Sequence, residues 1–136
     1  MKLKLDHIAV AVSDLGAALA AFEQQLGLAC DRVEEVPEQG ARVAFLDLDG
    51  SHLELVQALD AGSPIARSIA KRGEGLHHVC FEVPSLDQAI AGLTAKGVQL
   101  ATQPTPGAKG SRVVFVHPKS MNGVLVELVE KAPPPC

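Results

Sequence analysis

Residues 73–83, Gly-Glu-Gly-Leu-His-His-Val-Cys-Phe-Glu-Val, combine a glycine-bounded break with an alternating run that begins at two histidines. Residues 5–12, Leu-Asp-His-Ile-Ala-Val-Ala-Val, have the same form. When the two stretches are aligned, His7 matches His78, and apolar residues match at the positions that follow. Strict alternation of this kind predicts a strand with one face turned to a core. The chain therefore contains one structural unit twice.

The first copy of the unit is predicted over residues 3–57. After its opening strand, Ser13-Asp14 offers a helix N-cap, apolar residues recur at helical spacing, and Gly27 provides a C-cap. Strands are predicted over residues 29–36, 41–49 and 51–57, with a tight hairpin at Asp49-Gly50. This order is β-α-β-β-β.

The second copy is predicted over residues 76–130, after a linker over residues 58–75 that holds a short helix. It contains a strand at 76–83, a helix at about 86–96 and strands at 98–102, 111–117 and 124–130. Residues 131–136 form a tail that we expect to be loose. We predict one α+β domain over residues 1–136, with a cupped sheet of mixed and antiparallel strands.

Composition narrows the classes of function. The 136 residues contain no Trp or Tyr and carry a formal net charge of −4, which argues against base stacking and against a basic nucleic-acid surface. No apolar run approaches the roughly 18 residues of a membrane span, and the N-terminus has no signal-peptide pattern. Three cysteines without a CxxC spacing indicate neither a disulfide framework nor a zinc finger. We expect a cytoplasmic protein that binds neither nucleic acid nor membrane.

Polar residues also recur at matching places of the two copies. His7 and His78 lie on the first strands, 71 residues apart, and Glu54 and Glu127 lie inside apolar runs of the last strands, 73 residues apart. A carboxylate among buried residues is costly unless it is paired or binds a metal. Alone, each histidine is typical of a structural strand residue, and each glutamate could face solvent. The repetition favours a two-histidine, two-carboxylate site for a divalent ion.

Three further histidines are also candidates for this site. His77 is the neighbour of His78, but the alternation places it in register with Asp6 and on the other face of the strand. His52 shares the face of Glu54, where it could support a metal ligand or simply be exposed. His117 precedes a turn and could line a pocket or face solvent.

The chain resembles the vicinal oxygen chelate (glyoxalase-like) superfamily, and within it the methylmalonyl-CoA epimerases. The resemblance covers residues 5 to about 130. Its least specific part is the Asp-His-Ile opening, and its most specific parts are Arg-Gly-Glu-Gly-Leu-His-His at 72–78, His-Pro-Lys-Ser at 117–120 and Gly-Val-Leu-Val-Glu-Leu-Val-Glu at 123–130.

The resemblance implies a metal-dependent enzyme that interconverts (R)- and (S)-methylmalonyl-CoA by removing and returning the α-proton through a metal-stabilised enolate. It implies His7, His78 and Glu127 as ligands, with Glu54 at the fourth place, and a role in propionate metabolism. Co²⁺ is the expected ion, with Ni²⁺, Mn²⁺, Zn²⁺ and Fe²⁺ as alternatives. Members of the superfamily are often homodimers, which is our expectation here.

The chain departs from some epimerases at two positions. These have glutamine at the place of Glu54 and a glutamate, a proposed base, on the preceding strand, where this chain has Val43. We therefore predict Glu54 and Glu127 as the catalytic acid–base pair.

An acyl-CoA substrate requires local cations for its phosphates. Lys119, Ser120 and Arg112 are the predicted substrate-binding residues, whereas Lys109 is more typical of a solvated surface charge. Two other functions remain open: a glyoxalase I-type lactoylglutathione lyase, which has nearly the same ligand order, and a non-enzymatic ligand-binding protein of this fold. A 2-His-1-carboxylate dioxygenase would instead require Fe(II) and oxygen.

Overall fold

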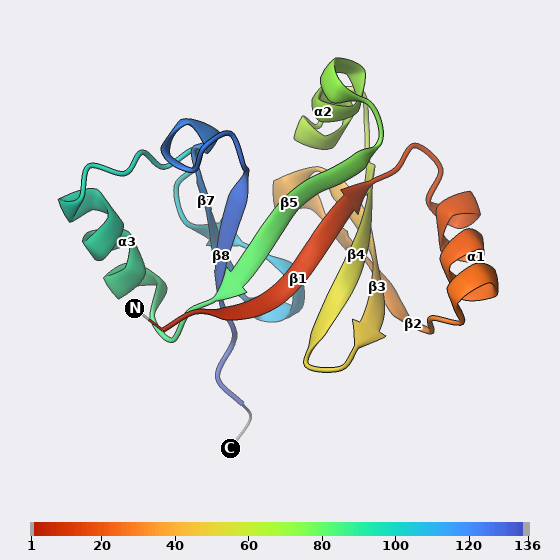
Figure 1. Ribbon diagram of the computed structural model, residues 1–136, viewed down its shortest axis with the longest axis horizontal. Coiled ribbons are helices and arrows are strands. Elements are labelled where there is room, and N and C mark those ends of the chain that lie inside the picture. The colour runs from red at the N-terminus through yellow and green to blue at the C-terminus, as the bar shows by residue number, and fades with distance from the viewer. Residues whose placement is uncertain (1, 135–136) are drawn as a thin grey trace. The chain divides into compact units, whose positions relative to one another are not determined.

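The computed structural model describes residues 2–134, and these divide into two compact units (Figure 1). The first unit comprises residues 7–77, and the second comprises residues 2–6 together with residues 78–134. Among the described residues, no helix has the length and apolar character needed to cross a membrane. Cys136 and Pro135, at the end of the expected tail, lie outside the described part of the chain.

The first unit has the predicted β-α-β-β-β order. Its elements, with the short helix that follows them, are β1 (Lys4–Ala11), which begins in the second unit, α1 (Leu15–Leu26), β2 (Cys30–Val36), the 3₁₀ turn η1 (Pro37–Gln39), β3 (Ala41–Leu48), β4 (Ser51–Ala58) and α2 (Pro64–Arg72). The strand order is β2-β3-β4-β1, in which β1 pairs with β4 in parallel and the other pairs are antiparallel.

The second unit repeats this plan. Its elements are β5 (Gly75–Glu82), which begins in the first unit, α3 (Leu86–Ala95), β6 (Thr105–Pro106), the 3₁₀ turn η2 (Ala108–Gly110), β7 (Arg112–Val116), the 3₁₀ turn η3 (Pro118–Ser120) and β8 (Val126–Glu130). The strand order is β5-β8-β7-β6, again with the first and last strands in parallel. The predicted α+β class and the internal repeat are confirmed.

One predicted strand is wrong. Residues 98–102 form no strand; a single bridge joins Leu100 to Val116, and only the two residues of β6 pair with the edge of β7. Pro104 and Pro106 lie after residues 98–102 and limit only the pairing that follows, because neither has a backbone N–H to donate. The chain instead follows β7 through isolated hydrogen bonds, such as that from Ala101 N to the carbonyl of Phe115.

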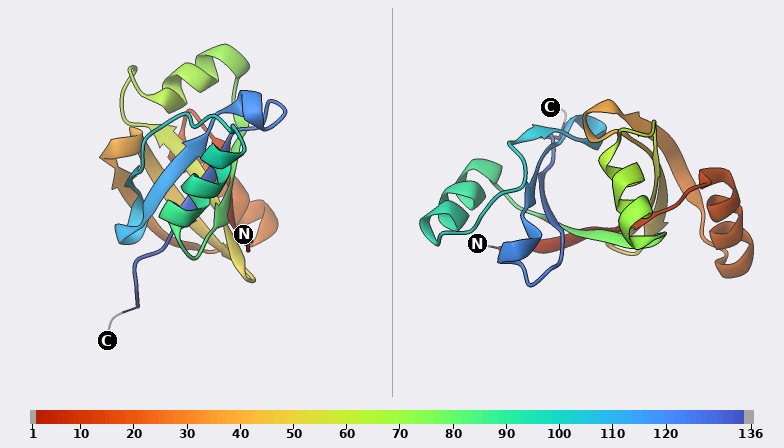
Figure 2. Two further views of the ribbon diagram at one scale, coloured as in Figure 1. Left: turned by 90° about the vertical axis from the view of Figure 1, so that its left-hand side faces the viewer. Right: turned by 90° about the horizontal axis from the view of Figure 1, so that it is seen from above.

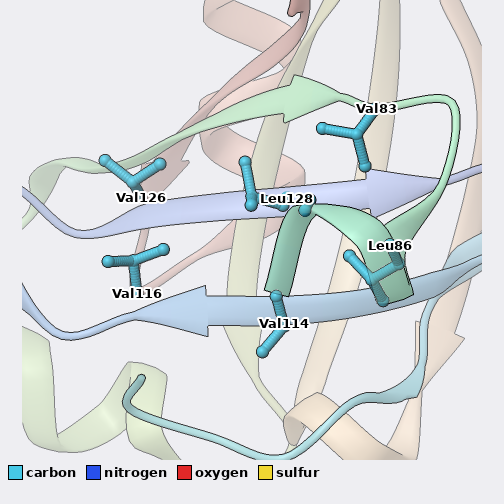
Figure 3. Close-up of a cluster of buried hydrophobic side chains, with 7 residues drawn as sticks. Val83, Leu86, Val114, Val116, Val126 and Leu128 are labelled. Atoms are coloured by element: carbon cyan, nitrogen blue, oxygen red, sulfur yellow. The ribbon is translucent and has the colours of Figure 1, made fainter. Parts of the chain in front are cut away.

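Each helix covers one face of its own strands. In the first unit, Leu15 and partly buried residues of α1 pack on Leu46, Leu55 and Val12. In the second unit, α3 lies across β7 and β8 (Figure 2), where Leu86 packs with Val114, Val116, Val126 and Leu128 (Figure 3). Because side chains alternate along a strand, the residues between these positions, including Glu54 and Glu127, lie on the opposite face.

The Asp14 and Gly27 caps of α1 are as predicted. The Asp14 carboxylate accepts a hydrogen bond from the N–H of Ala17, and Gly27 has a left-handed backbone with φ of 72°. Asp14 caps the N-terminus of α1 and Gly27 caps its C-terminus, which limits the helix between β1 and β2 to twelve residues.

Candidate active site

His7 and Glu54 form a buried pair in the first unit. In the parallel pairing of β1 with β4, Ala9 lies opposite Glu54, and His7 lies opposite His52. This register places the Nδ1 atom of His7 3.1 Å from Oε2 of Glu54. Both residues are buried, at 5% and 8% exposure. The predicted metal-ligand residues of this copy therefore meet on the face of the strands that α1 leaves uncovered.

His78 and Glu127 form the corresponding pair in the second unit. Cys80 lies opposite Glu127 in the parallel pairing of β5 with β8, as Ala9 lies opposite Glu54. The Nε2 atom of His78 is 2.9 Å from Oε1 of Glu127, and the two residues are 9% and 3% exposed. The same relative register in two separate ladders confirms that the sequence repeat is a structural repeat.

A phenylalanine flanks each glutamate on its antiparallel side. Phe45 on β3 lies opposite Glu54, and Phe115 on β7 lies opposite Glu127. The ring of Phe115 meets that of His78 edge to face, with centroids 5.3 Å apart. These rings exclude water around the carboxylates, which strengthens every electrostatic interaction that the carboxylates make.

His52 is the main difference between the two units. Its Nε2 atom is 2.7 Å from Oε2 of Glu54, the same oxygen that His7 contacts. The rings of His52 and His7 are stacked with centroids 4.9 Å apart, and Phe45 packs against His52 at 5.5 Å. Sequence reasoning identified His52 as sharing the face of Glu54 but did not assign it to the site. The His-x-Glu spacing on one strand was the available signal.

The donor set fits a divalent ion. His7, His52 and Glu54 each offer a ligand atom, and these atoms lie within 4.8 Å of one another. The His–Glu contacts of 3.1 and 2.9 Å are ordinary ion-pair separations, so the fit depends on the types of donor. Imidazole and carboxylate are also the ligand types that first-row divalent metals share.

Lys119 and Ser120 lie at the end of the second unit that carries His78 and Glu127. They form η3, directly after β7, whose last residue Val116 pairs with Val126, the neighbour of Glu127. The Ser120 hydroxyl accepts a hydrogen bond from the backbone N–H of Gln99, and the N–H of Lys119 donates to Nδ1 of His117. The side chains of Ser120 and His117 therefore stabilise the turn. The Lys119 ammonium forms no ion pair among the described residues.

Arg112 lies at the other end of β7. In the antiparallel pairing of β7 with β8, Arg112 lies opposite Glu130. Its guanidinium is 3.3 Å from the carboxylate of Asp87 on α3. Val116 is four residues further along the strand, which is a distance of about 13 Å. The structure therefore does not bring Arg112 together with Lys119 and Ser120.

Lys131 links the start of β1 to the end of β5 within the second unit. Its ammonium lies 3.0 Å from Oδ1 of Asp6 and 3.2 Å from Oε1 of Glu82. Burial of the ammonium opposes its charge, but hydrogen bonds and charge attraction from Asp6 and Glu82 outweigh this and raise the pKa of Lys131. The first residue of the expected tail is therefore held by two carboxylates.

Val43 is buried on β3, at 2% exposure, and lies opposite Val56 on β4. No carboxylate can act from this position. Of positions 43 and 54, only position 54 carries an ionisable side chain, that of Glu54.

Duplicated β-α-β-β-β units, each with a buried His–Glu pair on its first and last strands, characterise this chain. The family model described as "Glyoxalase/Bleomycin resistance protein/Dioxygenase superfamily" matches residues 6–115. An ethylmalonyl-CoA/methylmalonyl-CoA epimerase of Cereibacter sphaeroides is 39% identical over 92% of this chain and 96% of its own length. The mitochondrial methylmalonyl-CoA epimerase of Homo sapiens is 39% identical over 92% of this chain and 72% of its own length.

Among solved structures, a variant of Streptomyces coelicolor methylmalonyl-CoA epimerase in complex with 2-nitronate-propionyl-CoA is similar, with a TM-score of 0.91 and 36% identity. The match covers 96% of this chain and 98% of that one. The chain belongs to the methylmalonyl-CoA epimerase family of the glyoxalase superfamily.

Proposed function

We propose that this protein interconverts the (R) and (S) epimers of methylmalonyl-CoA with the help of a divalent ion. The observation that carries the proposal is the duplicated His–Glu pair, buried and in the same register in both units. The relatives named above, which are epimerases of CoA thioesters, support the substrate class. They favour this reaction over that of a lactoylglutathione lyase.

We propose His7, Glu54, His78 and Glu127 as the protein ligands of one ion, with Co²⁺ as its expected identity. Each unit then supplies one histidine and one glutamate. A bound divalent ion would supply Lewis-acid stabilisation for the negative charge that develops when the α-proton leaves. Binding would also compensate the burial of the two carboxylates, Glu54 and Glu127.

Glu54 and Glu127 are the proposed acid–base pair. The proton leaves a carbon that lies between a thioester carbonyl and a carboxylate, and the electron pair of the broken C–H bond moves into the thioester carbonyl to form an enolate. One glutamate accepts this proton on one face, and the other glutamate donates a proton on the opposite face. The apolar and aromatic neighbours exclude water from this exchange.

A glutamate can serve as ligand and base if its two oxygens have different tasks. In the described part of the chain, the hydrogen bond with His52 and the ion-pair contact with His7 are both made by Oε2 of Glu54. Oε1 is therefore the oxygen of Glu54 that is available to take a proton.

Lys119 and Ser120 are proposed to bind an anionic part of the substrate, either a CoA phosphate or the free carboxylate. Arg112, at the other end of β7, is proposed to contact a different part of an extended CoA chain. The homodimer and the cytoplasmic location remain predictions of the sequence.

The test is solvent deuterium incorporation, measured separately from (R)- and (S)-methylmalonyl-CoA. The metal-stripped protein is compared with the same protein after addition of Co²⁺. Metal-dependent exchange with interconversion of the epimers is expected. No exchange from either epimer in the reconstituted protein would overturn the proposal, and the hemithioacetal of glutathione would then be the next substrate to assay. Ethylmalonyl-CoA is assayed in parallel, because one methylene changes discrimination by only about 1–3 kcal/mol.

A further inference from the structure

His52 breaks the symmetry between the two units. The 73-residue offset that relates Glu54 to Glu127 relates His52 to Leu125. An imidazole can donate a hydrogen bond to the neighbouring carboxylate, whereas an isobutyl side chain cannot. The Glu54 carboxylate therefore has a histidine partner two residues before it on its own strand, whereas the corresponding position before Glu127 holds Leu125.

The contact between His52 and Glu54 has the form of a strong hydrogen bond. Its length is 2.7 Å, and the His52 side chain is 23% exposed while that of Glu54 is 11% exposed. When the Glu54 carboxylate is ionised it only accepts, and the hydrogen of this contact then belongs to Nε2 of His52. Hydrogen bonds to charged acceptors are shorter and stronger than neutral ones, and a partly buried position protects them from water.

The His52 ring is itself held in place. It stacks on His7 at 4.9 Å with an interplanar angle of 29°, and it meets the Phe45 ring at 5.5 Å. The ring cannot turn away without losing both contacts. The Glu54 carboxylate is consequently fixed through an atom, Oε2, that two imidazoles contact.

We propose that His52 is a positioning residue that holds Oε2 of Glu54, so that Oε1 exchanges the substrate α-proton on one face. This inference rests on the proposed function, because it deepens the role given there to Glu54. In the exchange, the Cα–H bond breaks, its electron pair enters the thioester carbonyl, and the O–H bond forms at Oε1. His52 contacts Glu54 and does not touch the substrate.

The proposal predicts that replacement of His52 slows proton exchange from one epimer of the substrate more than from the other. If Glu54 serves one face and Glu127 the other, loss of His52 slows proton removal from only one epimer. The other epimer still loses its proton to Glu127 and can regain a deuteron on the same face. A general loss of folding or of metal would instead slow both epimers equally.

The experiment compares His52→Leu with His52→Gln, whose side-chain amide can restore a donor near the place of Nε2. Arg42→Leu is the matched control, because it replaces an exposed polar residue of the neighbouring strand by leucine and lies outside the proposed site. Co²⁺ affinity is measured by calorimetric titration, the Co²⁺ visible spectrum is recorded without substrate, and deuterium incorporation is followed from each epimer. Thermal unfolding of each variant is measured alongside.

For His52→Leu, we expect Co²⁺ affinity to fall about 10–100-fold, as is typical when a partner of a metal ligand is removed. With Co²⁺ at a saturating concentration for each variant, exchange from one epimer should slow at least about tenfold more than exchange from the other. His52→Gln should recover most of both losses, and Arg42→Leu should match the wild type.

Unchanged Co²⁺ affinity and spectrum in His52→Leu would overturn the positioning role. Equal slowing of both epimers would overturn the assignment of Oε1, and failure of glutamine to restore either property would assign His52 to packing alone. If the wild type exchanges neither epimer, the proposed function fails, and the Co²⁺ titration of the variants still decides whether His52 positions Glu54.

Discussion

Gln57 and Glu130 perform the same structural task in the two units. The side-chain oxygen of Gln57 accepts a hydrogen bond of 2.6 Å from the backbone N–H of Leu15, the first residue of α1. Glu130 accepts one of 2.7 Å from the N–H of Leu86, the first residue of α3. Each lies three residues after the site glutamate of its strand. The strand that carries the glutamate is thereby tied to the N-terminus of the helix behind it.

Replacement of Gln57 or Glu130 by leucine should lower the free energy of unfolding by about 1 kcal/mol, because a helix N–H loses its acceptor. Thermal or urea unfolding measures this loss. Gln99→Leu is the control, since the Gln99 side chain caps no helix. Stability equal to that of the wild type in both variants would show that water replaces these caps.

Alanine at Glu54 or at Glu127 should lower turnover by at least about 10²-fold. This is the lower limit of the contribution that a positioned acid or base typically makes. Deuterium incorporation from each epimer checks this, and circular dichroism with thermal unfolding checks that the fold is intact. Near-normal turnover in both variants would contradict the acid–base pair.

Lys119→Ala should raise KM for the CoA thioester more than it lowers kcat, because the ammonium contributes binding to an anionic group. The wild-type KM should also rise with salt, and this salt dependence should be weaker in the variant. Lys96→Ala, which removes a lysine at the end of α3, is the control. An unchanged KM would remove Lys119 from the substrate site.

Lys131→Met should remove a pH-dependent part of the stability. The pKa of Lys131 is raised in the folded protein from its usual 10.5, so its contribution is fully present below pH 10.5 and is lost as the pH rises through the folded-state pKa. The effect should be at most about 1 kcal/mol, because the side chain is more than half exposed. Unfolding temperatures of wild type and variant should therefore converge above pH 10.5, whereas Lys71→Met should show no such convergence.

Removal of the divalent ion should lower the unfolding temperature, because an ion that binds only the folded state stabilises it by mass action. At a free Co²⁺ concentration of 100 times the dissociation constant, the expected stabilisation is about 2.7 kcal/mol. Unfolding scans with chelator and with added Co²⁺ measure it. A chelator-insensitive unfolding temperature would indicate that the His–Glu pairs are stable without an ion.

The sequence by itself determined the repeat, the α+β class and the recurrence of one histidine and one glutamate on the first and last strands of each copy. It could do so because strand alternation has a period of two, and because a carboxylate within an apolar run is costly enough to be noticed. The caps of α1 followed from local chemistry at Asp14 and Gly27 in the same way.

Only the tertiary structure decided which atoms meet. The register of β4 beside β1 placed His52 as well as His7 on Oε2 of Glu54, and the ends of β7 separated Arg112 from Lys119. The failed strand at residues 98–102 has the same origin. Strand pairing is a long-range property, and a shift of one residue would turn every side chain to the other face, which local sequence patterns do not record.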